Sequence, residues 1–342
     1  MSRNCLAVAV AMLALAASAP AEPLTFDTPF TPIDAAAQTA AMGAGINVLG
    51  YDPVWRDPAK GRFVVEDFQR IRAAGFQTVR IGLHAFDFLN SAGQLNGAWL
   101  AKLDGFTKAA LDAGLNVILD EHNYEACGKD ADDCQVKLIA VWRQLAPHYR
   151  NAPNRVMFEI LNEPHQALSA DRWNSLFAEA LAVVRASNPS RNVIVGPGNW
   201  NAFDALPMLQ LPEADRHLIV TFHYYKPMKF THQGAFWAGQ PTSGIVWGTP
   251  LERTVLKQDF DLVKTWSLAH DRPIFLGEFG VFDQAAPAER INWTAAVRTE
   301  AVARGFAFAW WQFDGNFVLW QGADRGWNRP LLDALIPPPS VQ

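Results

Sequence analysis

The chain has 342 residues, of which 50% are hydrophobic and 18% are charged, and its formal net charge is −5 at pH 7. This length and composition allow a large core, and one α/β barrel with its loops would use nearly all of the chain. Because no basic stripe or run of lysine and arginine is visible, nucleic acid is excluded as an expected partner.

The start of the chain has the pattern of a secretory signal peptide over residues 1–21. Arg3 and the amino terminus supply positive charge, residues 5–17 form a short apolar run, and small residues precede a cleavage site after Ala21. The apolar run is too short to span a bilayer stably. We therefore expect export to the periplasm or the medium, no membrane association after signal removal, and one folded domain over residues 22–342.

Short apolar segments alternate with helical patterns along the rest of the chain. The expected strands cover residues 44–49, 77–83, 115–120, 156–161, 192–195, 218–222, 273–276 and 305–311. Helical spacing predicts helices over 63–74, 99–113, 136–150, 171–187, 251–270 and 288–304. Eight alternating βα units imply a parallel sheet closed into a (β/α)8 barrel. No Gly-x-Gly-x-x-Gly follows the first strand, which weakens a dinucleotide-binding interpretation.

Two cysteines remain after the signal, Cys127 and Cys134, and they bracket a polar hexapeptide in an expected loop. In an oxidising compartment two nearby cysteines in such a loop form a disulfide, and we expect this pairing. Two free thiols are the alternative. A zinc site would need more ligands than this loop offers.

The fourth expected strand ends in Asn162-Glu163-Pro164. Pro164 has no N–H and cannot extend a central strand, so the strand stops about there. Glu163 is thereby placed at the C-terminal end of a strand, where parallel α/β barrels keep their catalytic groups. Glu278 follows the seventh strand in the same way. Two carboxylates at strand ends are a candidate acid–base and nucleophile pair.

Further polar and aromatic residues fall in or after the other strands. They are Arg80, His122, Asn162, His223, Tyr225 and Trp311. Each has a plainer explanation when taken alone, such as a capping carboxylate, a structural histidine or a buried ion pair. In a barrel the strand ends converge on one mouth, so these distant residues are expected to become neighbours.

The ordered set of Arg80, His122, Asn162-Glu163-Pro164, His223-x-Tyr225, Glu278 and Trp311 resembles glycoside hydrolase family 5, the large cellulase family. The resemblance runs from about residue 45 to residue 320 and is closest to endo-β-1,4-glucanases. It implies a retaining hydrolase of cellulose-type β-1,4-glucan, with Glu163 as acid/base and Glu278 as nucleophile. It implies no cofactor and no metal. The expected partner is a polysaccharide or oligosaccharide substrate, and the expected form is a monomer.

The resemblance also implies how the catalytic pair is supported. Tyr225 and Arg80 should hold Glu278 ionised and aimed, and His223 should lie near Glu163. Physically, a nearby anionic Glu278 would raise the pKa of Glu163 and keep its proton available near neutral pH. Once Glu278 is esterified, Glu163 can act as a base toward water.

Sugar contacts are implied for three further residues. Asn162 should bond the 2-hydroxyl, His122 should touch the sugar bound before the scissile bond, and Trp311 should form the floor beneath that sugar. Apolar sugar faces stack on indole rings, so other tryptophans are candidates for additional subsites, with core packing as the alternative. These candidates are Trp200, Trp237 and Trp247.

The sequence argues against two rival functions. A metal-dependent hydrolase using Asp120, His122 and His223 would need a cluster such as His-x-His on the first strand, which offers only Asn47. A carbohydrate-binding protein without catalysis would not need both glutamates and their supports. Within the family, mannan, xyloglucan and β-1,3-linked glucan remain open as substrates, because subsite loops decide that choice.

Overall fold

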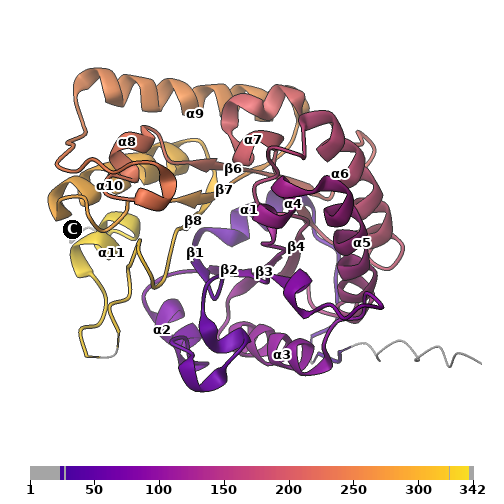
Figure 1. Ribbon diagram of the computed structural model, residues 1–342. Helices are drawn as coiled ribbons and strands as arrows, with labels where there is room; N and C mark the ends of the chain where they lie inside the picture. Colours follow the sequence, from indigo (N-terminus) through magenta and orange to yellow (C-terminus); the bar gives the residue numbers. More distant parts are fainter. Residues whose placement is uncertain (1–23, 27, 323, 339–342) are drawn as a thin grey trace, which may run out of the picture.

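A computed structural model describes residues 24–26, 28–322 and 324–338 of the chain, and the expected signal peptide lies outside them. The strands form a closed parallel barrel in sequence order, which confirms the predicted (β/α)8 fold. They lie at the centre of the molecule with the helices around them (Figure 1). The strands are β1 (Ala44–Val48), β2 (Thr78–Gly82), β3 (Asn116–Asp120), β4 (Val156–Glu159), β5 (Val193–Val195), β6 (Leu218–Tyr224), β7 (Ile274–Phe279) and β8 (Ala307–Trp310).

Eleven α-helical segments are found among the described residues, and several short ones were not expected from the sequence. The helices of the outer ring are α2 (Glu66–Ala73), α3 (Gly97–Asp112), α5 (Ala131–His148), α6 (Ala170–Arg185), α9 (Pro250–His270) and α10 (Pro287–Ala303). The remaining segments are α1 (Ala35–Met42), α4 (Tyr124–Lys129), α7 (Gly198–Asn201), α8 (Met228–Thr231) and α11 (Arg329–Leu335). No helix in the described part of the chain has the length and apolarity needed to cross a membrane.

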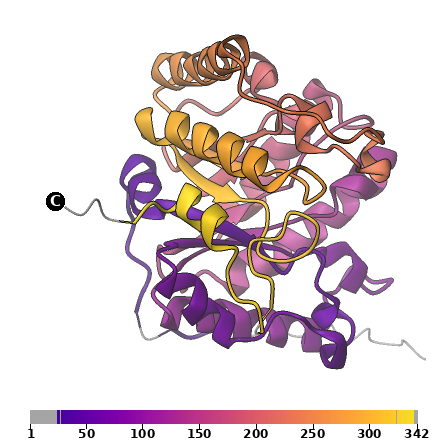
Figure 2. The ribbon, with the colours of Figure 1, turned by 90° about the vertical axis from the view of Figure 1, so that its left-hand side faces the viewer.

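The barrel interior is filled by side chains and closed at one end. Ile118, Met157, Ile194, Ile219 and Phe275 point inward from five neighbouring strands and form one buried cluster. That cluster also includes Ala35 and Met42 of α1, the helix at one end of the barrel in Figure 2. A much larger core lies between the strands and the outer helices. The interior is therefore a packed core, and a ligand would be bound at the opposite, C-terminal end of the strands.

Several element boundaries differ from those expected. The strand β4 ends at Glu159, so Glu163 lies in the loop beyond it, whereas β6 and β7 extend through His223 and Glu278. The segment 226–250 is not wholly irregular, since it contains α8 and a 3-10 turn over Phe236–Ala238. Strand pairing with neighbours extends or shortens these ends, and a single segment of sequence does not contain that information.

The helix α5 begins at Ala131, five residues before the expected start. Its N-cap, Asp130, accepts hydrogen bonds from the backbone N–H groups of Asp132 and Asp133, both at 3.0 Å. An aspartate in this position satisfies donors that the helix itself leaves free. The polar hexapeptide between the cysteines is therefore the junction of α4 and α5, and not an open loop.

Candidate active site

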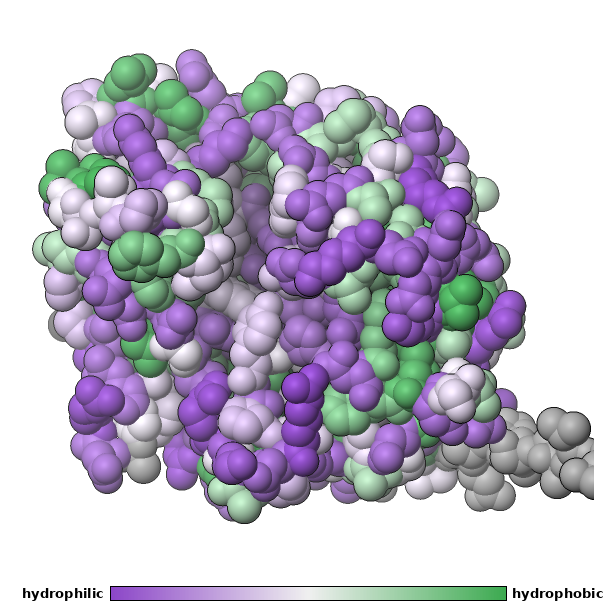
Figure 3. Space-filling model, viewed as in Figure 1, coloured by the Kyte–Doolittle hydropathy of each residue, from purple (hydrophilic) through white to green (hydrophobic). Residues whose placement is uncertain are grey.

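The C-terminal end of the barrel opens into a cavity of about 2010 Å³. The face of the molecule is hollowed at this place (Figure 3). Of the residues selected from the sequence, those that line the cavity are His122, Asn162, Glu163, Trp200, His223, Tyr225, Trp237, Glu278 and Trp311. Arg80 is fully buried just behind the lining. The expected convergence of strand ends is thus present in the structure.

The two candidate catalytic carboxylates face each other across His223. Nδ1 of His223 lies 2.6 Å from Oε1 of Glu163 and 3.7 Å from Oε2 of Glu278. One ligand atom from each of the three side chains lies within 4.8 Å of the others. The register of β6 against β7 shifts between Phe222 and His223, and His223 then pairs with Glu278. Such irregularities turn side chains to a new direction, here into the mouth of the barrel.

The guanidinium of Arg80 organises the base of the site. It grips Glu159 with two parallel hydrogen bonds, Nε to Oε2 at 2.7 Å and Nη2 to Oε1 at 2.9 Å. Its Nη1 donates to Oε1 of Glu278 at 2.8 Å, and its Nη2 donates to Oδ1 of Asn162 at 2.7 Å. A planar guanidinium held by a fork in this way has little freedom to turn.

Glu278 receives more stabilisation of its charged form than Glu163 does. The hydroxyl of Tyr225 donates to Oε2 of Glu278 at 2.9 Å, in addition to the bond from Arg80. Burial raises the pKa of Glu278 to about 7, and Arg80 and Tyr225 oppose that rise. Burial raises the pKa of Glu163 to about 8. Because Arg80 and Tyr225 both donate to Glu278, its charged form is the better stabilised of the two, and Glu163 is the carboxyl that keeps its proton.

Burial is the main cause of the raised pKa of Glu163, and not the charge of Glu278 as expected from the sequence. His223 is uncharged, because burial lowers its pKa to about 4. Its Nε2 lies 3.4 Å from the amide nitrogen of Asn201, a donor, so Nδ1 carries the ring proton and donates to Glu163. The neutral histidine thus orients Glu163 without adding a charge.

His122, Asn162 and Trp311 form one wall of the cavity. Nδ1 of His122 lies 2.5 Å from Oδ2 of Asp120, and its ring stacks on the indole of Trp311 with an interplanar angle of 4°. Nδ2 of Asn162 lies 3.5 Å from Nε2 of His122. The indole ring of Trp311 is partly exposed to the cavity, as a sugar-stacking platform requires.

The three further tryptophan candidates differ in exposure and in their position relative to the cavity. Trp200 and Trp237 line the cavity and are 43% and 64% exposed. The expectation that Trp247 could form a sugar subsite is wrong, because this residue is buried in the core and does not line the cavity. The guanidinium of Arg253 lies 5.1 Å above its ring. Core packing, the plainer alternative, therefore applies to Trp247.

Several features of the site were not predicted from the sequence. Glu159 is a buried ion partner of Arg80, and so is Asp120, which the sequence suggested only as a ligand of the rival metal site. Tyr51 and Tyr124 line the cavity with their hydroxyl oxygens 3.4 Å apart. One signal could have found Glu159. An acidic residue inside an apolar strand requires a buried partner, and Arg80 lies inside another such strand.

The cysteines form the expected disulfide, Cys127–Cys134. Both are buried, one in α4 and one in α5, and do not lie in a polar loop as expected. Among the described residues, the only three acidic, histidine or cysteine side chains placed to share a metal ion are Glu163, His223 and Glu278. The rival set of Asp120, His122 and His223 does not form such a group.

Eight parallel strands and a facing pair of carboxyl groups at their C-terminal mouth, Glu278 buried and Glu163 partly buried, define a barrel hydrolase of the glycosidase class. A family model described as cellulase, glycosyl hydrolase family 5, matches residues 39–317. The chain belongs to this family, as its ordered motifs predicted.

Solved structures support the same assignment. Endoglucanase Cel5A from Thermotoga maritima has a TM-score of 0.85 and 34% identity, and the alignment covers 89% of this chain and 100% of that one. The cellulose synthase subunit Z of Clostridioides difficile has a TM-score of 0.81 and 34% identity, covering 86% and 99%.

Endoglucanase H of Acetivibrio thermocellus is 28% identical over 310 residues, which cover 87% of this chain and 33% of that protein. The chain spans about a third of the length of this relative and of the cellulase/esterase CelE from the same organism.

Proposed function

We propose that this chain is a retaining endo-β-1,4-glucanase, with Glu278 as nucleophile and Glu163 as acid/base. One observation carries the proposal: oxygen atoms of the two carboxyl groups lie within 4.8 Å of each other at the mouth of the barrel. Retaining glycosidases hold their carboxyl groups roughly 5–5.5 Å apart, whereas inverting enzymes need about 6.5–9.5 Å to admit a water molecule.

In the first step the ionised Glu278 attacks the anomeric carbon, and the glycosidic C–O bond breaks. Glu163 gives its proton to the leaving oxygen, so that the departing chain leaves as an alcohol. In the second step Glu163, now a carboxylate, takes a proton from water, and that water displaces Glu278 from the sugar. Because two displacements occur on opposite faces, the configuration at the anomeric carbon is retained.

The support around Glu278 fits the role of nucleophile. Arg80 and Tyr225 donate to its two oxygens, which favours the carboxylate form and fixes its direction. Among the described residues, the carboxyl of Glu163 has one side-chain hydrogen-bond partner, the neutral His223, which suits a group that must both give and take a proton. In this proposal Asn162 binds the sugar 2-hydroxyl, and Trp311 and His122 contact the sugar ring before the scissile bond.

Cellulose-type glucan is the substrate that the relatives favour. Endoglucanases predominate among their names, and one solved complex contains a hyperthermophilic endo-β-1,4-glucanase with its substrate. A second candidate is β-mannan, because Cel5A of Thermotoga maritima was solved with cellobiose and also with mannotriose. Trp200 and Trp237 serve as additional stacking platforms in either case.

We also propose that the chain is exported through the signal pattern over residues 1–21. The Cys127–Cys134 disulfide supports this proposal, since disulfides persist in oxidising compartments and are rare in the reducing cytosol. Export also places the enzyme where polymeric glycans are encountered. Edman sequencing of the mature protein would test the proposal, and the expected first residue is Glu22.

The test of the activity is release of reducing ends from carboxymethylcellulose, mixed-linkage glucan and mannan. We expect rapid release from the glucans and loss of about 10⁴-fold or more in Glu278→Gln, which keeps the shape but cannot attack. Proton NMR of the first product should show the β-anomer. Activity on mannan alone would replace the substrate but keep the mechanism, and a first product of inverted configuration would overturn the mechanism.

A further inference from the structure

His165 is a buried residue that neither the resemblance nor the proposed mechanism uses. It follows Glu163 by two positions and is 3% exposed. Its Nδ1 lies 2.7 Å from the backbone carbonyl oxygen of Glu163. Because a carbonyl only accepts hydrogen bonds, Nδ1 carries the proton and donates to it. His165 is not part of the cavity lining, so any effect on the reaction must pass through Glu163.

The backbone at Glu163 needs such a constraint. Its φ is +41°, in the left-handed region that residues with a side chain seldom adopt. Strained backbone of this kind persists only where the surroundings hold it in place. Two contacts do so: His165 binds the carbonyl of Glu163, and the N–H of Trp200 donates to the carbonyl of Pro164 at 3.2 Å.

On one side the ring of His165 lies directly against the backbone of Gly128 in α4. A methyl group at Gly128 would overlap Nε2 of His165 and would lie 2.8 Å from Cδ2. The carbonyl of Gly128 also accepts a hydrogen bond from the N–H of Ala167 at 3.1 Å. Glycine at this position is therefore required by the close approach of the histidine, and not by its own backbone angles.

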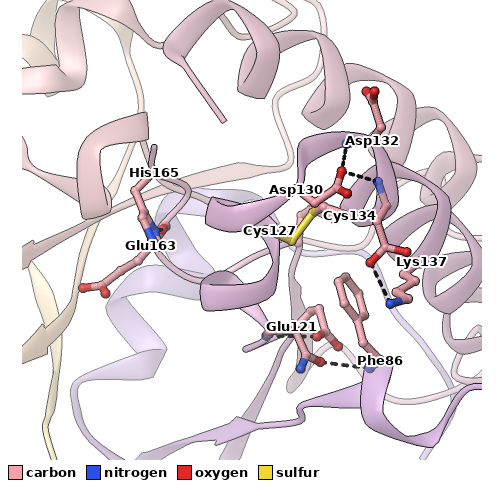
Figure 4. Close-up of a disulfide and its surroundings, with 12 residues drawn as sticks. Phe86, Glu121, Cys127, Asp130, Asp132, Cys134, Lys137, Glu163 and His165 are labelled. Atoms are coloured by element: carbon pink, nitrogen blue, oxygen red, sulfur yellow. Dashed lines mark hydrogen bonds and ion pairs between the residues drawn. A yellow bond between two sulfur atoms is a disulfide. The ribbon is translucent and has the colours of Figure 1, made fainter. Parts of the chain in front are cut away.

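The helix α4 is itself held in place by the disulfide. Cys127, the neighbour of Gly128, is bonded to Cys134 in the first turn of α5, and Figure 4 shows this bond beside His165 and Glu163. A six-residue helix has little stability of its own, so its position depends on such attachments. The disulfide thus fixes the surface against which His165 packs.

On the other side the ring of His165 stacks on Trp200, with 4.5 Å between centroids and 16° between planes. The ring of Tyr124 meets it edge-on at 5.6 Å between centroids. His165 is therefore confined from three directions while Nδ1 points at the backbone of Glu163. An imidazole used only to fill space would not need both a fixed tautomer and a fixed direction.

We propose that His165, clamped between the disulfide-braced helix α4 and Trp200, is a positioning residue that holds the left-handed backbone of Glu163 and so aims its carboxyl at the leaving oxygen. The proposal rests on the proposed role of Glu163 as acid/base. Loss of the clamp lets the carboxyl move away from the line of proton transfer. Proton transfer is more sensitive to such a shift than nucleophilic attack by Glu278, which sits on β7.

The test compares two substrates of the purified, oxidised enzyme. Cellotetraose has a poor leaving group that must be protonated, whereas 2,4-dinitrophenyl β-cellobioside has a good leaving group that leaves without a proton. For His165→Ala we expect kcat/KM on cellotetraose to fall about 10- to 100-fold, the range found for misplaced catalytic groups. On the dinitrophenyl substrate it should change less than about 3-fold. His165→Asn keeps a donor near the position of Nδ1 and should restore most of the loss.

Gly128→Ala tests the clamp while His165 itself is kept, because the added methyl group would push against the imidazole ring. Alanine favours a helix over glycine, so this variant should fold, and circular dichroism and the Tm should confirm that it does. We expect it to lower cellotetraose turnover selectively. In the His165→Ala background it should have no further effect, because the group that it displaces is gone.

His270→Ala is the matched control, since it removes another histidine stacked on tryptophan, Trp266 of α9, at 4.4 Å between centroids. It should leave both rates unchanged. Equal losses on both substrates in folded His165→Ala would overturn the positioning role. If Glu163→Gln itself shows no selective loss on cellotetraose, the proposed acid/base function fails instead, so the two failures are distinguishable.

Discussion

Nη1 of Arg80 donates a hydrogen bond to Oε1 of Glu278 at 2.8 Å, and both side chains are buried. The direction of this bond is fixed, because Glu159 accepts two hydrogen bonds from the same guanidinium and holds its orientation. The positions of three strands, β2, β4 and β7, therefore determine where the proposed nucleophile points.

Replacing Arg80 by lysine should show how much the fixed orientation of the guanidinium contributes to the reaction rate. A lysine keeps the charge but cannot bind Glu159 through a fork and reach Glu278 at once. We expect kcat/KM to fall roughly 10- to 150-fold, as for loss of one charged hydrogen bond. Steady-state kinetics with a dinitrophenyl cellobioside would measure it. A wild-type rate in Arg80→Lys would show that charge alone suffices.

The reaction should have a bell-shaped dependence on pH. In the proposed mechanism Glu278 reacts ionised and Glu163 protonated, and burial raises their pKa values to about 7 and about 8. We expect kcat/KM to be highest near pH 7 to 8 and to fall on both sides. Initial rates on cellotetraose would define both limbs. Glu163→Gln should abolish the alkaline limb, and a variant that kept it would assign that limb to another group.

Stability should fall as the pH rises, partly because of Glu121. This carboxyl is fully buried and accepts hydrogen bonds from the N–H groups of Ala85 and Asn123, and burial raises its pKa to about 8. Its unfolded pKa is about 4.3. Between these values the folded state binds more protons than the unfolded state. The stabilisation is thus complete below about pH 4 and is lost as the pH approaches 8.

Denaturant unfolding at several pH values would measure this loss. Glu121→Gln keeps an acceptor oxygen and cannot ionise, so its free energy of unfolding should depend less on pH than that of the wild type. Equal slopes for the two proteins would show that Glu121 does not titrate in this range.

The disulfide should make a measurable contribution to stability. Cys127 and Cys134 are seven positions apart, and closing a loop of that size stabilises by about 2–3 kcal/mol in the chain-entropy model. We expect the free energy of unfolding of the Cys127→Ser, Cys134→Ser variant to be lower by that amount. Adding reductant should bring the wild type close to the variant and leave the variant unchanged.

Trp237 and Trp247 should respond to alanine in opposite ways. Trp237 is 64% exposed in the cavity, so Trp237→Ala should raise KM on long glucans roughly 3- to 10-fold and leave the Tm unchanged. Trp247 is buried, so Trp247→Ala should lower the free energy of unfolding by about 3–5 kcal/mol. Its KM should stay near that of the wild type. A normal KM in Trp237→Ala would remove that ring from the substrate site.

The amino-acid sequence by itself determined the barrel and most residues of its mouth. Alternating strand and helix patterns depend on nearest neighbours in the chain, and a polar residue such as Glu163 after an apolar strand is visible without a structure. The ordered residues from Arg80 to Trp311 also identified the family.

Only the tertiary structure decided which of these residues touch and which are buried. Arg80 and Glu159 are 79 positions apart, and their pairing depends on the register in which the barrel closes. The clamp on His165 requires α4 to pack against the loop that follows β4. Trp237 and Trp247 are ten positions apart in one segment, yet one faces the cavity and the other the core. Burial and contact arise from the packing of distant segments, and local sequence patterns do not contain that information.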